Sequence, residues 1–159
     1  MYKEKNMEKI INNKTGILAT IGISFGWVCN LLGGGDAVLK FLLLLMLVDY
    51  LTGLAIALIF KKSPKTETGA ANSTIGFKGI CKKIMMLFMV LIAYKADVML
   101  GLDYIRSSAI LAFTINELVS LVENAGLMGV KIPPVLINLI DVLKVKEEKD
   151  KTKIEENTN

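Results

Sequence analysis

The sequence predicts an all-α fold, a bundle of membrane-spanning helices, and two observations lead to this prediction. Residues 41–60 form an apolar run of twenty residues with one ionisable side chain, Asp49. At about 1.5 Å of rise per residue, a helix of this length crosses the roughly 30 Å of hydrocarbon in a bilayer. In addition, the chain is 53% hydrophobic, and its charged residues lie almost wholly at its ends and in one loop. Such segregation is typical of integral membrane proteins.

Asp49 does not prevent insertion of this run. Thirteen Leu, Ile, Phe and Val residues occur in residues 41–60. Each contributes about −0.3 to −0.6 kcal/mol near the membrane centre, whereas one Asp costs about 2.5 to 3.5 kcal/mol. The apolar side chains therefore outweigh the carboxylate. We expect Asp49 to face a lysine of the same bundle, such as Lys95, or else a pore or a neighbouring subunit.

Four segments are predicted to span the membrane, within a membrane domain at residues 15–143: residues 16–32, 38–60, 84–102 and 105–122. A polar segment with four lysines, residues 1–14, precedes them. The glycines at 33–35 can reverse the chain, so the first two segments should form a helical hairpin. The first segment is rich in glycine, and three spans remain if it does not insert.

The C-terminal elements are less apolar. Residues 105–122 contain Asn116 and Glu117, so hydropathy leaves this segment between a spanning helix and an interfacial one. A short amphipathic helix is predicted at residues 134–144, because its apolar spacing begins at a proline suited to a first helical turn. Residues 145–159 form a charged tail that we expect to be mobile.

Residues 61–83 are predicted to be a strongly basic loop that sets the topology. Cytoplasmic loops retain Lys and Arg, and the counts of these residues alternate along the chain. Four spans would place both termini in the cytoplasm, and three would place only the C-terminus there. The basic residues of this loop are Lys61, Lys62, Lys65, Lys78, Lys82 and Lys83.

The composition argues against an enzyme. The chain has no histidine, and its two cysteines, Cys29 and Cys81, match no metal-ligand spacing. No nucleophile with an adjacent base and no phosphate-binding loop is present, so we expect no cofactor and no metal. The basic residues lie beside apolar spans, which also argues against nucleic-acid binding.

Two predicted helices carry small residues at a spacing that favours close packing. Gly22 and Gly26 form a GxxxG pair, and Asp49, Gly53 and Ala57 follow at intervals of four. Small residues let helix backbones approach, and a polar neighbour can hydrogen-bond across the contact. This packing can occur within one bundle or between subunits of an oligomer.

A polar stripe about 120° wide is predicted on the fourth segment, at about 100° per residue. Polar side chains at membrane depth usually face a partner or water. The stripe therefore lines an aqueous lumen formed by several copies, or it lies in water beside an interfacial helix. Its members are Asn116, Glu117, Ser120, Glu123 and Asn124.

Three motifs in order and spacing resemble the toxin-secretion and phage-lysis holin family over about residues 16–140. They are DYLTG at 49–53, TIGFKGICKK at 74–83, and NELVSLVENAG at 116–126 with its continuation to Pro133. The stretch at 64–72 looks inserted relative to the family. The family includes holins of phages of Gram-positive bacteria and holin-like proteins encoded beside clostridial toxins.

The resemblance implies a protein that oligomerises in the bacterial cytoplasmic membrane and opens non-specific lesions. A cytoplasmic endolysin or a folded toxin would leave through them as passive cargo. Met7 could serve as a second start that yields a shorter product. Two other classes stay open: a small-solute channel or transporter subunit with Asp49 and Glu117 as ion ligands, and a membrane scaffold that recruits a partner through its charged tail.

Overall fold

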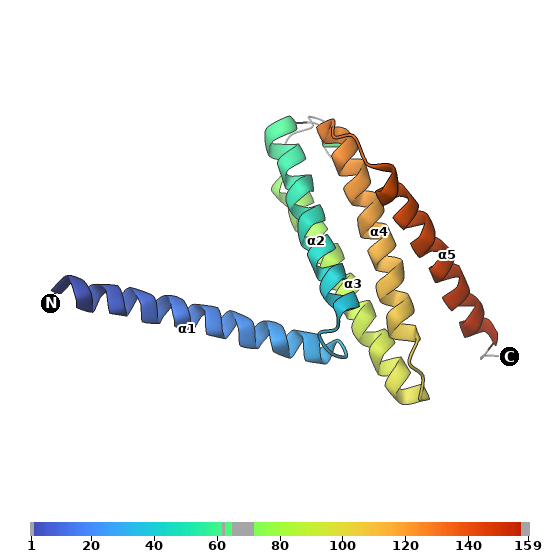
Figure 1. The fold of residues 1–159 in the computed structure, drawn as a ribbon, viewed down its shortest axis with the longest axis horizontal. Helices are drawn as coiled ribbons and strands as arrows, with labels where there is room; N and C mark the ends of the chain where they lie inside the picture. Colours follow the sequence, from blue (N-terminus) through green and yellow to red (C-terminus); the bar gives the residue numbers. More distant parts are fainter. Residues whose placement is uncertain (1, 62, 65–71, 157–159) are drawn as a thin grey trace. The chain divides into compact units, whose positions relative to one another are not determined.

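The chain is helical almost throughout in the computed structural model, which describes residues 2–61, 63–64 and 72–156 (Figure 1). The described part contains no strand, which confirms the all-α prediction. The chain divides into two compact units, Met1–Gly35 and Asp36–Asn159. The helices are α1 (Tyr2–Leu31), α2 (Ala37–Ala55), the π-helical turn η1 (Ile56–Phe60), α3 (Ser73–Leu100), α4 (Ile105–Met128) and α5 (Pro134–Glu156).

Helix α1 is one continuous helix of 30 residues, which runs through the polar segment at 1–14 into the predicted span at 16–32. The division into a cytoplasmic segment and a span stays a prediction. Residues 2–14 contain no Gly or Pro, and their Lys, Glu and Met residues are good helix formers. The helix ends where Gly33 and Gly34 adopt φ angles of 92° and 105°. The positive φ angles expected at these glycines are confirmed for Gly33 and Gly34, whereas the chain reversal and the helical hairpin stay predictions.

Helix α2 begins at a capped end and continues into η1. The Asp36 side chain accepts a hydrogen bond from the amide of Leu39 at 2.8 Å, which satisfies one of the free amides of the first turn. The π-helical turn ends at Lys61, which has a φ of 50°. The combined helix covers Ala37–Phe60, within one residue of the predicted 38–60.

Helix α3 begins at Ser73, so residues 73–83 are helical and the prediction of a loop through residue 83 is wrong there. Asn72 is the N-cap, and its side-chain oxygen accepts hydrogen bonds from the amides of Thr74 and Ile75. This cap offsets the cost of the helical glycines that follow, Gly76 and Gly79. The helix ends at Leu100, two residues before the predicted end of that span, and Gly101 is its C-cap.

Helix α4 is six residues longer than the predicted 105–122 and ends at Gly129, which has a φ of 79°. Among the described residues, Ala37–Phe60 and Ile105–Met128 are long and apolar enough to cross a membrane. Helices α1 and α3 do not meet that criterion, so the count of four spans stays a prediction.

Helix α5 reaches Glu156, so the predicted short helix ending at 144 is wrong. The predicted charged tail consists largely of Lys and Glu, which have high helix propensity and occur here at spacings that place opposite charges one turn apart. The prediction of a separate charged tail rested on the low apolar content of residues 145–159. Low apolar content does not prevent a helix from continuing when its first turns are packed against another helix.

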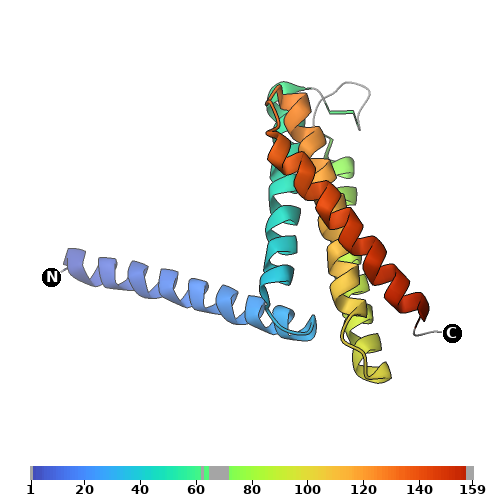
Figure 2. The same cartoon turned by 45° about the vertical axis from the view of Figure 1, so that its right-hand side comes forward.

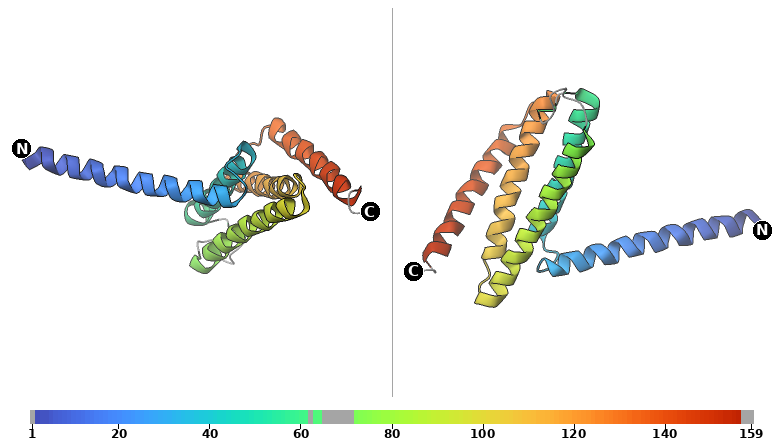
Figure 3. Two further views of the ribbon diagram at one scale, coloured as in Figure 1. Left: turned by 90° about the horizontal axis from the view of Figure 1, so that it is seen from below. Right: turned by 180° about the vertical axis from the view of Figure 1, so that it is seen from behind.

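Helices α2, α3 and α4 alternate in direction and lie side by side, and α5 runs back along α4 (Figures 1, 2 and 3). Leu39, Leu42, Val90 and Ile110 are fully buried between them. The outer surfaces of α2 and α3 carry large apolar side chains such as Leu47, 56% exposed. Charged side chains, in contrast, lie among the helices.

Candidate functional site

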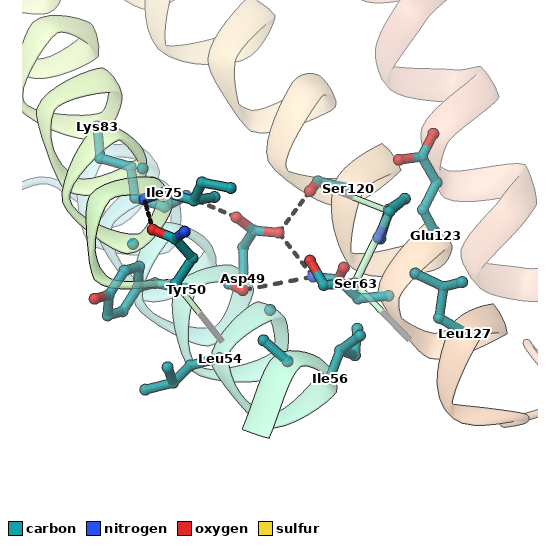
Figure 4. Close-up of a pocket in the computed structure, with 17 residues that line it drawn as sticks. Asp49, Tyr50, Leu54, Ile56, Ser63, Ile75, Lys83, Ser120, Glu123 and Leu127 are labelled. Atoms are coloured by element: carbon teal, nitrogen blue, oxygen red, sulfur yellow. Dashed lines mark hydrogen bonds and ion pairs between the residues drawn. The ribbon is translucent and has the colours of Figure 1, made fainter. Parts of the chain in front are cut away.

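Asp49 lies at the centre of a polar network that joins α2, α3 and α4 (Figure 4). Its Oδ2 accepts a hydrogen bond from Nζ of Lys83 on α3 at 2.9 Å. Its Oδ1 accepts one from Oγ of Ser120 on α4 at 2.6 Å. The carboxylate predicted to face another helix therefore faces two. The expected lysine of the same bundle is Lys83; Lys95, named as the example, instead lies 5.3 Å from the ring centroid of its neighbour Tyr94.

The ammonium of Lys83 joins two carboxylates. Its Nζ also lies 2.5 Å from Oε2 of Glu117 on α4. The side chains of Lys83, Asp49 and Glu117 are 16%, 14% and 4% exposed. Charges removed from water must be paired and hydrogen-bonded to be tolerated, and this arrangement supplies both. One ammonium on α3 thus joins carboxylates of α2 and α4.

Asn124 extends the network by one turn of α4. Its Nδ2 donates to Oδ1 of Asp49 and to Oγ1 of Thr52, each at 3.0 Å. The Thr52 hydroxyl in turn donates to the carbonyl of Val48 at 2.9 Å. The Asp-x-x-Thr part of the DYLTG motif therefore presents two acceptors to the same amide.

The predicted polar stripe of α4 divides into two parts. Glu117, Ser120 and Asn124 point towards α2 and α3 and are used in the network. Asn116 and Glu123 are exposed. In one chain, therefore, three of the five residues proposed to line a lumen have partners inside the bundle. Their role in an oligomer stays a prediction.

The predicted packing residues of α2 lie beside open space. A cavity of about 180 Å³ lies next to Asp49 and is also lined by Gly53, Ala57, Gly76 and Gly79 (Figure 4). A Cβ atom added at Gly53 or Gly79 would meet nothing within 4 Å. The small residues therefore leave room between α2, α3 and α4, and their role in packing between subunits stays a prediction.

On α1, Gly22 and Gly26 are exposed, and a Cβ atom at either would meet nothing within 4 Å. Within the described part of the unit Met1–Gly35, therefore, nothing packs on the GxxxG face. Packing between subunits by this face stays a prediction.

The basic residues predicted to lie in one loop have different surroundings. Lys61 follows η1, and Lys78 and Lys82 are exposed on α3. Lys83 points inward to Asp49 and Glu117, so it does not belong with residues that face water. Two further members, Lys62 and Lys65, lie outside the described residues.

A second polar cluster, which the sequence analysis missed, joins the opposite ends of the same helices. Nη1 of Arg106 on α4 lies 2.6 Å from Oδ2 of Asp36, the N-cap of α2. The Asp97 carboxylate on α3 accepts hydrogen bonds from the amides of Ile105 and Arg106, at 2.9 and 2.8 Å. It therefore caps the start of α4 from another helix.

The hydrogen bond from Arg106 lowers the pKa of Asp36 below its usual 3.8, helped by the Leu39 amide and opposed by burial. A usable signal was the position of Asp36, directly after three glycines and before an apolar run, which is typical of an N-cap. Within the described residues, no group of three or more His, Cys, Asp or Glu side chains could hold a metal ion.

Comparison of the sequence with known proteins shows which family and which relatives the chain is similar to. The model of the bacteriophage holin family matches residues 26–145. The Lmo0128 protein of Listeria monocytogenes is 38% identical over 148 residues, which cover 92% of this chain and 96% of the relative. A 14.9 kDa protein of Clostridium perfringens, from the 3′ region of nagH, is 32% identical over 89% of this chain and its own full length.

A relative from Bacillus phage phi105, which bears the name "Probable holin", is 30% identical over 117 residues. These cover 70% of this chain and 81% of the relative. No solved structure matches the chain.

Proposed function

Because the chain belongs to the bacteriophage holin family, we propose that it oligomerises in the bacterial cytoplasmic membrane and opens non-specific lesions there. An endolysin, or a folded toxin, leaves through these lesions as passive cargo. The family membership, the phage relative named as a holin and the two helices long enough to cross a bilayer support this proposal.

The observation that carries the membrane part of the proposal is the inverted polarity of the second unit. Asp97 and Glu117 are 5% and 3% exposed, whereas Leu47 and Phe88 are 56% and 54% exposed. A water-soluble bundle would reverse this pattern, because apolar surface is unfavourable in water and buried charge is costly. Lipid is the solvent that suits this surface.

The proposed topology has four spans with both termini in the cytoplasm, or three spans if residues 16–32 do not insert. Lys78 and Lys82, exposed near the start of α3, support a cytoplasmic position for that end of the bundle, because cytoplasmic segments retain lysine.

The polar network argues against the small-solute channel. As ion ligands, Asp49 and Glu117 would need free carboxylate oxygens, but Lys83 already lies between them at hydrogen-bonding distance. Their geometry fits a structural tie between helices better than a cation site.

Inducible expression in a bacterium tests the proposal, with membrane potential and release of a cytosolic reporter enzyme followed over time. The expected result is an abrupt loss of potential together with enzyme release. A selective channel would release ions and not the enzyme, and a scaffold would release neither. Continued growth with an intact potential at high expression would refute the proposal.

A matched pair of variants connects the result to insertion of α2. Leu47→Asp places a carboxylate on the exposed apolar face of α2, at a cost of about 2.5 to 3.5 kcal/mol at membrane depth. We expect it to delay or abolish enzyme release. Leu47→Ile keeps the position apolar and should release the enzyme at the time of the unmodified protein.

A further inference from the structure

The cavity beside Asp49 reaches one end of the helix bundle. At that end it is lined by Ser63, Pro64 and Asn72, which lie between the end of η1 and the start of α3. At its other end it is lined by Asp49 and Lys83, which form an ion pair (Figure 4). The cavity therefore runs along the helices, from the connection between η1 and α3 to the ion pair.

The cavity stops near the middle of the bundle. Asp49 is 12 residues after Ala37 and 11 before Phe60, about 18 and 17 Å from the two ends of this helix at roughly 1.5 Å per residue. The lining residues lie at positions 49–57 of α2 and η1, 75–83 of α3 and 120–127 of α4. In each of these helices they belong to the half nearer to the connection between η1 and α3.

The other half of the bundle is filled by apolar side chains. Met46 and Met86, each three residues beyond the ion pair, are 5% exposed. Leu42, Val90 and Ile110 are fully buried. Among the described residues, this half contributes nothing to the cavity lining. The cavity therefore has an apolar floor, and its mouth lies at the connection between η1 and α3.

The cavity has room and hydrogen-bonding partners for water. Its volume of about 180 Å³ is more than ten times the roughly 10 to 15 Å³ that one water molecule requires. An ammonium has three donors, and the structure gives Nζ of Lys83 two partners, Asp49 and Glu117. Glu123 also lines the cavity and is exposed. A polar cavity of this size is suited to hold water, whereas an apolar one would stay dry.

Four small residues keep the cavity open. Gly53 and Ala57 line it from α2 and η1, and Gly76 and Gly79 line it from α3. A Cβ atom at Gly53 or Gly79 would meet nothing within 4 Å, and one at Gly76 would lie 3.9 Å from the Tyr50 hydroxyl. Larger side chains at these positions would occupy the cavity without moving the helix backbones.

We propose that this cavity is a water-filled vestibule, open at the start of α3 and closed at mid-bilayer, that hydrates the polar network around Asp49 from one side of the membrane. The inference rests on the proposed function, whose topology places the start of α3 in the cytoplasm. Water then reaches an ion pair that hydrocarbon cannot solvate. The apolar half of the bundle, about 18 Å of helix, is the barrier that remains between the two aqueous phases.

Thiol accessibility tests the vestibule. In a Cys29→Ser/Cys81→Ser background, Gly53→Cys places a thiol in the cavity, and Leu51→Cys places one at a similar depth on the exposed apolar face of α2. Sealed membrane vesicles are treated with permanently charged 2-(trimethylammonium)ethyl methanethiosulfonate. Unreacted thiols are then measured in detergent by gel shift with a maleimide polymer. We expect Gly53→Cys to react at least ten times faster than Leu51→Cys, because lipid excludes the charged reagent.

Lys78→Cys identifies the side from which the reagent enters, because Lys78 is exposed near the start of α3. Gly53→Cys and Lys78→Cys should both react in inverted vesicles, whose cytoplasmic face is outside, and neither should react in right-side-out vesicles. Reaction of both in right-side-out vesicles alone would support the vestibule and refute the proposed topology. Reaction of Leu51→Cys as fast as Gly53→Cys would show that α2 is not in lipid, and would refute both.

A cavity-filling variant tests the path of the reagent. Gly76 lies nearer to the start of α3 than Gly79 does, so Gly76→Leu places a large side chain near the mouth. Added to Gly53→Cys, it should slow the reaction at least tenfold. Phe77→Leu is the matched control, because Phe77 is 67% exposed and does not line the cavity. It should leave the rate unchanged.

Three results would overturn the vestibule. If Lys78→Cys reacted in inverted vesicles and Gly53→Cys reacted in neither orientation, water would not reach the cavity. Equal reaction of Gly53→Cys in both orientations would show a path through the apolar half. An unchanged rate in the Gly76→Leu variant would show that the reagent reaches position 53 by another path.

Discussion

Lys83 stabilises the bundle because it neutralises carboxylates from two other helices. Asp49 and Glu117 have no second cation within the described network, and both are nearly buried. Without Lys83, two carboxylates would face each other across the space that its ammonium occupies. Loss of one partner from a buried ion pair costs more than the pair contributes, because the remaining charge is left unpaired.

Lys83→Met should therefore destabilise the bundle by about 3 kcal/mol or more, the usual cost of breaking a buried pair. Thermal unfolding in detergent micelles, followed by far-ultraviolet circular dichroism, measures this loss. Lys82→Met removes the same charge from an exposed neighbouring position and should have little effect. Adding Glu117→Gln to Lys83→Met should recover much of the loss, because Ser120 and Asn124 still donate to Asp49. Equal stability of the two lysine variants would contradict this role.

Sequence alone could identify Asp49 as a carboxylate that faces another helix but could not identify Lys83 as its partner. Asp49 lies 11 residues before the end of η1, and Lys83 lies 10 residues after the start of α3. At about 1.5 Å per residue these are similar depths in two antiparallel helices. The sequence analysis began the third helix at residue 84, so Lys83 was excluded. The start of α3 depends on the Asn72 cap, a local signal that the hydropathy pattern does not contain.

At the scale of elements, the start of α2 depends on two interactions of one side chain. Asp36 caps the helix through Leu39 and pairs with Arg106 of α4. The Arg106 pair was missed in the sequence because Arg106 was counted only for topology. Its partner is 70 residues away in the sequence, and no local pattern reports such a distance.

Asp36→Asn should lower thermal stability at neutral pH and not at acid pH. Asn keeps the cap but removes the charge that pairs with Arg106. A carboxyl with a lowered folded pKa stabilises the fold above its unfolded value, here 3.8, and this stabilisation is lost as the pH falls through the folded pKa. Melting temperatures of the variant and the unmodified protein should therefore differ at pH 7 and converge as the pH falls through the lowered folded pKa of Asp36.

Asp103→Asn is the control for this pH dependence, because it removes the same charge from an exposed position in the α3–α4 connection. It should change melting little at either pH. A gap between Asp36→Asn and the unmodified protein that persists in acid would show that the carboxylate charge is not what stabilises this end of the bundle.

At the scale of the whole molecule, the two units present different surfaces for assembly. The unit Asp36–Asn159 satisfies its Asp49 network internally. The unit Met1–Gly35 leaves the Gly22–Gly26 face of α1 open. All-α class and both of the longest apolar helices could be predicted from hydropathy, because that pattern is local. The polar residues that face inward could not be predicted from hydropathy, because their orientation depends on contacts between helices that are far apart in the sequence.

Gly26→Val should reduce oligomerisation without destabilising the chain. A side chain at this position meets nothing within 4 Å, and valine has a higher helix propensity than glycine, so the fold of one chain tolerates it. Two α1 helices packed through Gly22 and Gly26 would be held apart by the added branched side chain. Chemical cross-linking in membranes should show fewer oligomers, and enzyme release should be late or absent.

Ser24→Val is the matched control, since Ser24 is also exposed on α1 and lies about 160° to 200° around the helix from the two glycines at roughly 100° per residue. It adds the same side chain to the opposite face and should leave both oligomers and timing unchanged. If Gly26→Val also kept oligomers and timing, the GxxxG face would not be an interface. Assembly would then have to use the second unit, where α5 and the exposed strip of Asn116 and Glu123 are the surfaces left to test.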